Sequence, residues 1–149
     1  MGQKVVRYTG GCACGAVRFE AIDKPLRVGL CHCLTCRKHH GAAFNPFVVF
    51  PFEAVFIAGG LRSWRSSEHS TRLSCEVCSS PICQQEDDSG EIELHGGSFD
   101  ETSLFPPEYE NWTLHREDWL PHLGVREHPA NVSAEILDQS RHVRSWRQH

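Results

Sequence analysis

The sequence predicts an all-β fold, a small complex domain of coiled antiparallel sheets with zinc knuckles. Short β-branched and aromatic runs recur along the 149 residues, glycine and proline separate them, and most of the eight cysteines stand in tight pairs. Hydrophobic residues make up 40% and charged residues 23% of the chain, which is typical of a globular domain. We therefore expect many short strands, few helices and turns that bind metal.

Nine segments have the composition of strands, because they are rich in β-branched and aromatic residues and are flanked by turn residues. In chain order they are Val5–Tyr8, Ala16–Phe19, Leu26–Leu30, Asn45–Phe50, Phe52–Ile57, Leu61–Trp64, Ser70–Leu73, Ile82–Gln85 and Ile92–His95. Pro51 separates the fourth segment from the fifth, and Gly59 and Gly60 turn the chain before the sixth. Five phenylalanines in this region are expected in the core, namely Phe44, Phe47, Phe50, Phe52 and Phe56.

Helical signals are few. Thr35–His40 can form one helical turn that ends at Gly41, because glycine favours the left-handed conformation after a helix. Glu117–His122 can form another. The composition changes near residue 128, so we expect one domain over residues 1–128 and a tail over 129–149. For the tail, a weak helix capped by Ser133 and a frayed end are both open alternatives.

Composition also excludes several classes of protein. Fifteen lysines and arginines against nineteen acidic residues give a formal charge of −4, so no basic surface for nucleic acid is expected. No apolar run approaches the ~18 residues that a membrane helix needs. The first residues lack the apolar core of a signal peptide, so we expect a cytoplasmic protein, without a membrane partner, whose thiols are kept reduced.

The cysteines form three tight groups and one isolated residue. Cys12 and Cys14 make a C-x-C pair, Cys31–Cys36 contains a C-x-C-x-x-C triplet, and Cys75 and Cys78 make a C-x-x-C pair, whereas Cys83 stands alone. Two thiolates from one short loop can bind the same Zn²⁺ at about 2.3 Å, and two such loops complete a tetrahedral shell. The spacing therefore indicates zinc.

Seven clustered thiols divide most simply into four and three. One ion can take Cys31, Cys33 and Cys36, which leaves Cys12, Cys14, Cys75 and Cys78 for a second ion. Four protein ligands make a closed structural site, whereas three leave an open position, as in catalytic zinc sites. An alternative division remains open, in which the first four cysteines of the chain bind one ion and the last four bind the other.

Other interpretations of the cysteines require features that the sequence does not show. Disulfides need an oxidising compartment, a thioredoxin-like redox pair needs a βαβ unit, and iron–sulfur clusters use different spacings. Histidine ligation by His32, His39 or His40 is a further alternative, although His32 lies between two cysteines and its side chain should point away from theirs. The isolated Cys83 is expected to be a small buried hydrophobic residue.

The cysteine motifs belong to a wider pattern. Residues 10–17 read GGCACGAV and residues 31–44 read CHCLTCRKHHGAAF, and the later blocks are GLRSWRSS at 60–67, Arg72 before CEVCSSP at 75–81, GSFD at 97–100, Pro106 before Trp112, and REDWL at 116–120. Over about residues 8–128 this pattern resembles the glutathione-dependent formaldehyde-activating enzyme family, which also includes centromere protein V. Two positions depart from it: Ser79 replaces a usual glycine, and Glu110-Asn111-Trp112 replaces a common His-Ile-Trp.

The resemblance implies an all-β fold with two zinc ions per chain. It implies that Cys12, Cys14, Cys75 and Cys78 bind a structural zinc, and that Cys31, Cys33 and Cys36 bind a catalytic one. The implied activity is that of a carbon–sulfur lyase, S-(hydroxymethyl)glutathione synthase-like, which joins formaldehyde to the thiol of glutathione and so serves in aldehyde detoxification. The partners are then a small thiol and a small aldehyde.

Residue chemistry agrees with such a reaction. Three thiolates on Zn²⁺ form a site of net negative charge, which suits a soft fourth ligand such as a substrate thiolate. Arg37 and Lys38 directly follow the triplet and could bind the carboxylates of glutathione, or could offset the thiolate charge. The alternative function is a zinc-stabilised protein-interaction module without catalysis, as the resemblance to centromere protein V suggests.

Overall fold

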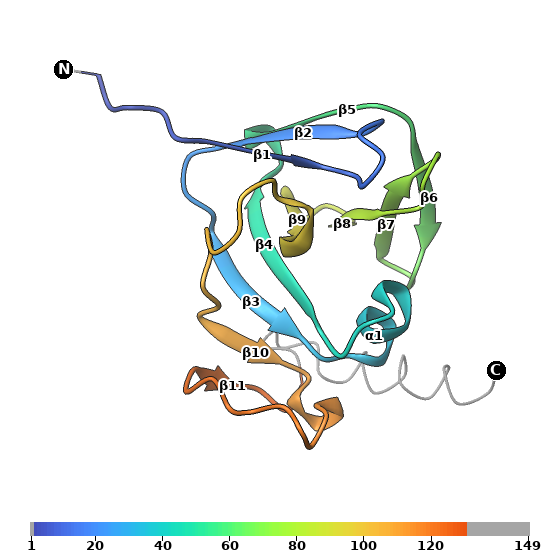
Figure 1. Ribbon diagram of the computed structural model, residues 1–149, viewed down its shortest axis with the longest axis vertical. Helices are drawn as coiled ribbons and strands as arrows, with labels where there is room; N and C mark the ends of the chain where they lie inside the picture. The colour runs from blue at the N-terminus through green and yellow to red at the C-terminus, as the bar shows by residue number, and fades with distance from the viewer. Residues whose placement is uncertain (1, 131–149) are drawn as a thin grey trace. The chain divides into compact units, whose positions relative to one another are not determined.

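The fold was analysed in a computed structural model, which describes residues 2–130, and there the all-β prediction is confirmed (Figure 1). The strands are β1 Arg7–Gly11, β2 Arg18–Ile22, β3 Arg27–Cys31, β4 Asn45–Pro51, β5 Val55–Ala58, β6 Leu61–Arg65, β7 Ser70–Cys75, β8 Pro81–Glu86, β9 Glu91–His95, β10 Tyr109–Asn111 and β11 Arg126–Glu127. The helices are α1 Leu34–His40 and three 3-10 turns, η1 Phe52–Ala54, η2 Gly96–Ser98 and η3 Thr113–His115. No helix within residues 2–130 has the length and apolar character to cross a membrane.

The chain divides into two compact units, each built from two segments. The first comprises Met1–Val28 and Pro46–Pro106, and the second comprises Gly29–Asn45 and Pro107–His149. The division falls inside β3. The boundary expected at residue 128 stays a prediction, and the alternatives for the tail concern residues that lie almost entirely outside the described range.

Antiparallel strands form the first unit. β2 pairs with both β1 and β5, and a second run of strands has the order β4-β9-β8-β7-β6. Side chains from both sets share one apolar core, because alternate residues of each strand point to the same side. The fully buried members of this core are Val17, Ala21, Phe50, Ile82, Cys83 and Leu94. The core holds the loops that carry the first cysteine group.

Parallel pairing appears in the second unit, in addition to the antiparallel sheets that were predicted. Tyr109 of β10 pairs with Gly29 of β3, and on its other side with Arg126 of β11, both in parallel. Neither β10 nor β11 was predictable, because strands of three and two residues carry no periodicity and their partners are distant in the chain.

The segment Glu117–His122, where one helical turn was expected, forms a single turn and no longer helix. Within it the backbone N–H of Leu120 donates to the carbonyl oxygen of Glu117, which closes the turn. Pro121 explains why the turn does not continue, because proline has no N–H to donate and disfavours the helical conformation of the residue before it. The same segment instead supplies the carbonyl oxygen of Pro121 to the side chain of Arg116.

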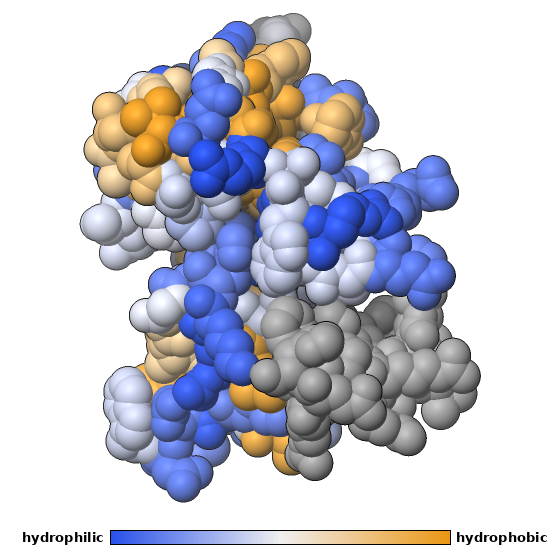
Figure 2. All heavy atoms as spheres, turned by 90° about the vertical axis from the view of Figure 1, so that its right-hand side faces the viewer, coloured by the Kyte–Doolittle hydropathy of each residue, from blue (hydrophilic) through white to orange (hydrophobic). Residues whose placement is uncertain are grey.

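Two of the five expected core phenylalanines are on the surface. Phe47 and Phe50 are buried, but Phe52 and Phe56 are 54% and 58% exposed. The run 52–57 is not one strand: residues 52–54 form η1, and β5 then points Phe56 outward and its two neighbours inward. Figure 2 shows one face of the molecule, on which hydrophobic and hydrophilic residues both reach the surface.

Candidate metal centres

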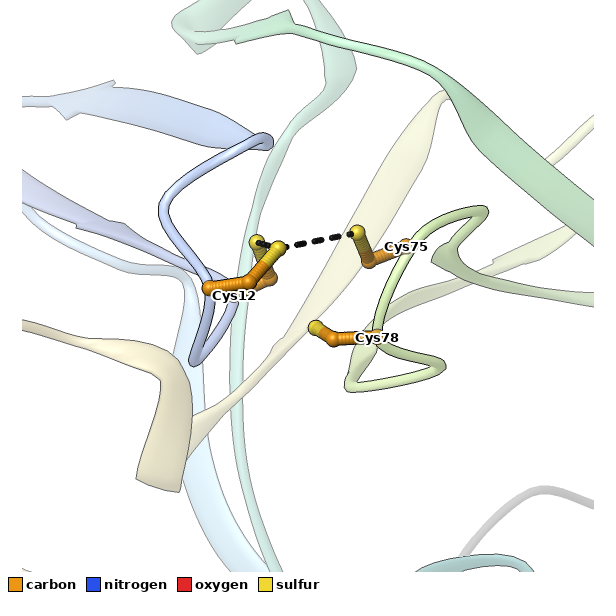
Figure 3. A group of neighbouring side chains, drawn as sticks. Cys12, Cys75 and Cys78 are labelled. Atoms are coloured by element: carbon orange, nitrogen blue, oxygen red, sulfur yellow. Dashed lines mark hydrogen bonds between the residues drawn. The ribbon is translucent and has the colours of Figure 1, made fainter.

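The first cysteine group lies in the first unit, between two turns. Cys12 and Cys14 belong to the loop after β1, Cys75 ends β7, and Cys78 belongs to the turn before β8. Their four Sγ atoms lie within 4.8 Å of one another, and the Sγ atoms of Cys14 and Cys75 are 3.8 Å apart. Figure 3 shows the sulfurs of Cys12, Cys75 and Cys78 pointing into one space. The set fits a tetrahedral zinc ion with four thiolate ligands.

Hydrogen bonds hold both turns in this shape. The N–H of Val17 donates to Cys12 Sγ at 3.1 Å, and the N–H of Val77 donates to Cys75 Sγ at 3.4 Å. Ser80 Oγ lies 3.1 Å from Cys78 Sγ and accepts a bond from the backbone N–H of Ala13, so it connects the two turns. These hydrogen bonds direct the sulfur atoms of both turns toward one centre.

The pKa values of these thiols are shifted by their neighbours, because several groups that can become negatively charged lie close together. The hydroxyl and backbone N–H of Ser80, with the backbone N–H of Cys14, lower the pKa of Cys78 to about 5. The backbone N–H of Ala16 favours the thiolate of Cys14, but the neighbouring thiols and burial together raise the pKa of Cys14 to about 12. Four thiolates so close together need a cation to balance them, which is the chemistry of a metal site.

The second cysteine group lies in the second unit, at the junction of β3 and α1. Cys31 ends β3, Cys33 is the N-cap of α1, and Cys36 is in its first turn. Cys33 Sγ accepts a hydrogen bond from the backbone N–H of Cys36 at 3.2 Å, and the helix ends at Gly41 in the left-handed conformation, as the sequence predicted. The three Sγ atoms lie within 4.8 Å of one another.

Only three ligating side chains of the described residues form this group, and no histidine or carboxylate among them joins it. The neighbouring thiols of Cys33 and Cys36, with burial, raise the pKa of Cys31 well above its ordinary value. The three thiols thus also need a cation to ionise together. With zinc bound, three thiolates would leave one coordination position for another ligand.

These groupings match the division into four and three, and not the alternative division. All eight thiols are free, so no disulfide is formed. Cys83 lies fully buried in the core of the first unit, where burial and Glu93 raise its pKa to about 12, as expected for a bystander. Both C-x-C pairs lie in loops or at strand ends, where local hydrogen bonds direct the sulfurs.

A buried network beside the triplet was not foreseen. His32 Nε2 lies 2.9 Å from Glu110 Oε1, and both side chains are 1% exposed. Glu110 Oε2 lies 3.3 Å from Arg116 NH1, which also binds Glu127 at 2.7 Å. The partners in this network are 6 to 78 residues apart in the chain. Contacts of this kind leave no local pattern in a single sequence. His32 indeed does not join the three sulfurs.

Arg37, expected to bind substrate, is engaged within the second unit. Its NH1 donates to the carbonyl oxygen of His115 at 2.8 Å, and its NH2 forms an ion pair with Glu117. The guanidinium therefore ties α1 to the segment after η3. A substrate carboxylate at this site would have to share the guanidinium of Arg37 with Glu117. The roles expected for Arg37 and Lys38 stay predictions.

Comparison with known proteins gave three findings. Residues 7–115 match the sequence model of the glutathione-dependent formaldehyde-activating enzyme family. An uncharacterized lyase of Schizosaccharomyces pombe is 28% identical over 75 residues, which are 50% of this chain and 55% of that protein. A crystal structure of a Rhodobacter sphaeroides protein has a similar fold, with a TM-score of 0.51 and 19% identity over 64% of this chain and 91% of that one.

Proposed function

The chain belongs to the glutathione-dependent formaldehyde-activating enzyme family, and from this premise we propose that it is a zinc-dependent carbon–sulfur lyase. It would join a small thiol such as glutathione to a small aldehyde such as formaldehyde. The family and the lyase among its relatives support a lyase-type enzyme, and the reaction and its substrates are the proposal. Cys31, Cys33 and Cys36 would hold the catalytic zinc, and the other four clustered cysteines would hold a structural zinc.

One observation carries the proposal: the two cysteine groups differ in their number of ligands. Four sulfurs surround one centre, whereas three of the described ligating side chains form the other. A closed shell of four thiolates stabilises a fold, and a shell of three leaves room for a substrate. A protein that used zinc only to stabilise its fold would have no need of an incomplete shell.

The reaction adds a thiol to a carbonyl group. The sulfur forms a bond to the aldehyde carbon, the π electrons of the C=O bond move to oxygen, and that oxygen takes the proton that the thiol loses. A zinc ion with an open position supplies Lewis acidity for a thiolate or a carbonyl oxygen. With zinc bound, Cys31, Cys33 and Cys36 would contribute three negative charges, so the site would carry a net charge of −1 and would suit a soft, electron-rich sulfur ligand.

Exchange spectroscopy tests the reaction directly. Zinc-loaded protein should accelerate the exchange of formaldehyde with its glutathione adduct, as measured by two-dimensional NMR of the equilibrium mixture. Cys36→Ser should abolish this acceleration, because it removes one ligand of the three-thiolate site. Cys83→Ala is the matched control, since Cys83 lies in the core and outside both groups, and it should retain the acceleration.

The outcomes separate the candidate functions. No acceleration by wild-type protein that carries two zinc ions would rule out this thiol and aldehyde, and would favour the interaction module. Equal acceleration by wild type and Cys36→Ser would place the chemistry elsewhere and contradict the assignment of the triplet.

A further inference from the structure

Glu110 is a buried carboxylate at a position where the resembled pattern commonly has histidine. It is 1% exposed, and each of its oxygens has a different partner, Oε1 facing His32 and Oε2 facing Arg116. A buried carboxylate is costly unless it is paired and hydrogen-bonded, so its contacts have to offset a substantial desolvation penalty. The second of these contacts supplies the counter-charge, because the side chain of Arg116 is itself only 9% exposed.

Two separate attachments hold His32 to β10. Its backbone N–H donates to the carbonyl oxygen of Asn111 at 3.0 Å, which extends the parallel pairing of β3 with β10 by one step. Its side chain meets Glu110, the preceding residue of β10. Since His32 lies between Cys31 and Cys33, whatever holds its backbone and ring also restricts the positions of both sulfurs.

The contact with Glu110 also selects a tautomer of the ring. A carboxylate oxygen accepts hydrogen bonds, so Nε2 of His32 is the donor in this contact. Nδ1 is buried without a hydrogen-bond partner among the described residues. The ring of Phe44 lies at a centroid distance of 5.6 Å, which further restricts the rotation of the His32 ring. The network thus fixes one ring nitrogen on Glu110 and leaves the other buried, close in sequence to two thiols of the triplet.

We propose that Glu110 is a positioning residue for the triplet site. It acts through His32, whose ring it holds in the Nε2–H tautomer, and so keeps the Cys31–Cys33 loop in the shape that binds metal. Arg116 faces the buried carboxylate with a guanidinium that it also shares with Glu127. Outer partners of a metal site commonly raise its affinity tenfold or more. The inference rests on the proposed metal site, but not on the proposed reaction.

Two measurements on zinc-loaded protein test the proposal. Long-range ¹H–¹⁵N NMR should find His32 as the Nε2–H tautomer in the wild type. Chelator competition, followed by native mass spectrometry, should show that Glu110→Leu loses the triplet ion about tenfold more readily while the four-cysteine ion is retained. Glu110→Gln should restore most of the affinity, because its amide oxygen can still accept the bond from Nε2. Glu127→Gln is the control, since it removes a partner of Arg116 that does not contact His32.

The proposal is overturned by any of three results. These are an Nδ1–H tautomer in the wild type, an unchanged triplet affinity in Glu110→Leu, or an equal loss of both ions in that variant. The first needs no variant, so the test survives if Glu110→Leu fails to fold. A protein with the expected tautomer and affinities that does not accelerate thiol–aldehyde exchange would refute the proposed reaction alone.

Discussion

Ser79 shows how one residue can depart from a pattern and still keep the geometry. Its φ is 64°, in the left-handed region where glycine is favoured, and its N–H donates to the carbonyl oxygen of Cys75 at 2.9 Å. The turn that presents Cys75 and Cys78 therefore requires this conformation whichever residue occupies position 79. A side chain makes the left-handed conformation costly by about 1–2 kcal/mol, which explains why glycine is usual there.

Replacing Ser79 with glycine should therefore stabilise the zinc-loaded protein. We expect a gain of about 0.5–1 kcal/mol in the free energy of unfolding, because the relief of backbone strain exceeds the greater entropy of glycine in the unfolded chain. Denaturant unfolding measures it. Ser80→Gly is the matched control and should destabilise, since the Ser80 hydroxyl contacts both Ala13 and Cys78. A lower unfolding free energy for Ser79→Gly would contradict this explanation of the turn.

Asp100 gives the first unit a defined dependence on pH. The guanidinium of Arg18 binds its carboxylate, as does the hydroxyl of Thr9 at 2.6 Å, and together they lower the pKa of Asp100 to about 2 from an ordinary 3.8. Because the folded pKa is the lower one, these contacts contribute their full stabilisation above about pH 4. The contribution should be lost as the pH falls from about 4 to about 2. NMR titration of the Asp100 carboxyl carbon measures this pKa. Arg18→Met should move the midpoint of the titration to higher pH. An unchanged midpoint would exclude the ion pair with Arg18 as the cause of the lowered pKa.

Among the elements, α1 and its flanking strand show what the sequence could predict. The expected helix Thr35–His40 and the observed Leu34–His40 differ by one residue, because Gly41 gives a local end signal and the cysteine triplet marks the start. The grouping of the seven thiols was predictable for the same reason, since short spacings decide it. By contrast, β10 pairs with β3 across 80 residues and Glu110 meets His32 across 78, and only the folded chain reveals such pairings.

The turns that carry the two cysteine groups should differ in their importance for folding. Cys75→Ser removes a ligand from a closed site between two turns of the first unit, and structural zinc supplies roughly 10 kcal/mol of folding free energy. We expect this variant to lose most of its thermal stability. Cys36→Ser should lower the melting temperature much less, while it abolishes thiol–aldehyde exchange. Equal losses of melting temperature in the two variants would count against separate structural and catalytic roles.

At the scale of the whole molecule, each cysteine group is contained within one compact unit. The group of four lies in residues 12–78 of the first unit, and the group of three lies in residues 31–36 of the second. Each ion would therefore stabilise its own unit, and neither group needs a ligand from the other. Under the proposed function, the eight cysteines of the sequence would be four structural ligands, three ligands of an open site and one core residue.

The metal content of the intact protein tests this account most directly. Native mass spectrometry of protein purified under reducing conditions should find two zinc ions per chain. Cys36→Ser should retain at least the ion of the four-cysteine group, whose ligands it leaves intact. One zinc ion in the wild type, after supply of excess zinc, would contradict the assignment of a metal to Cys31, Cys33 and Cys36 and with it the proposed function.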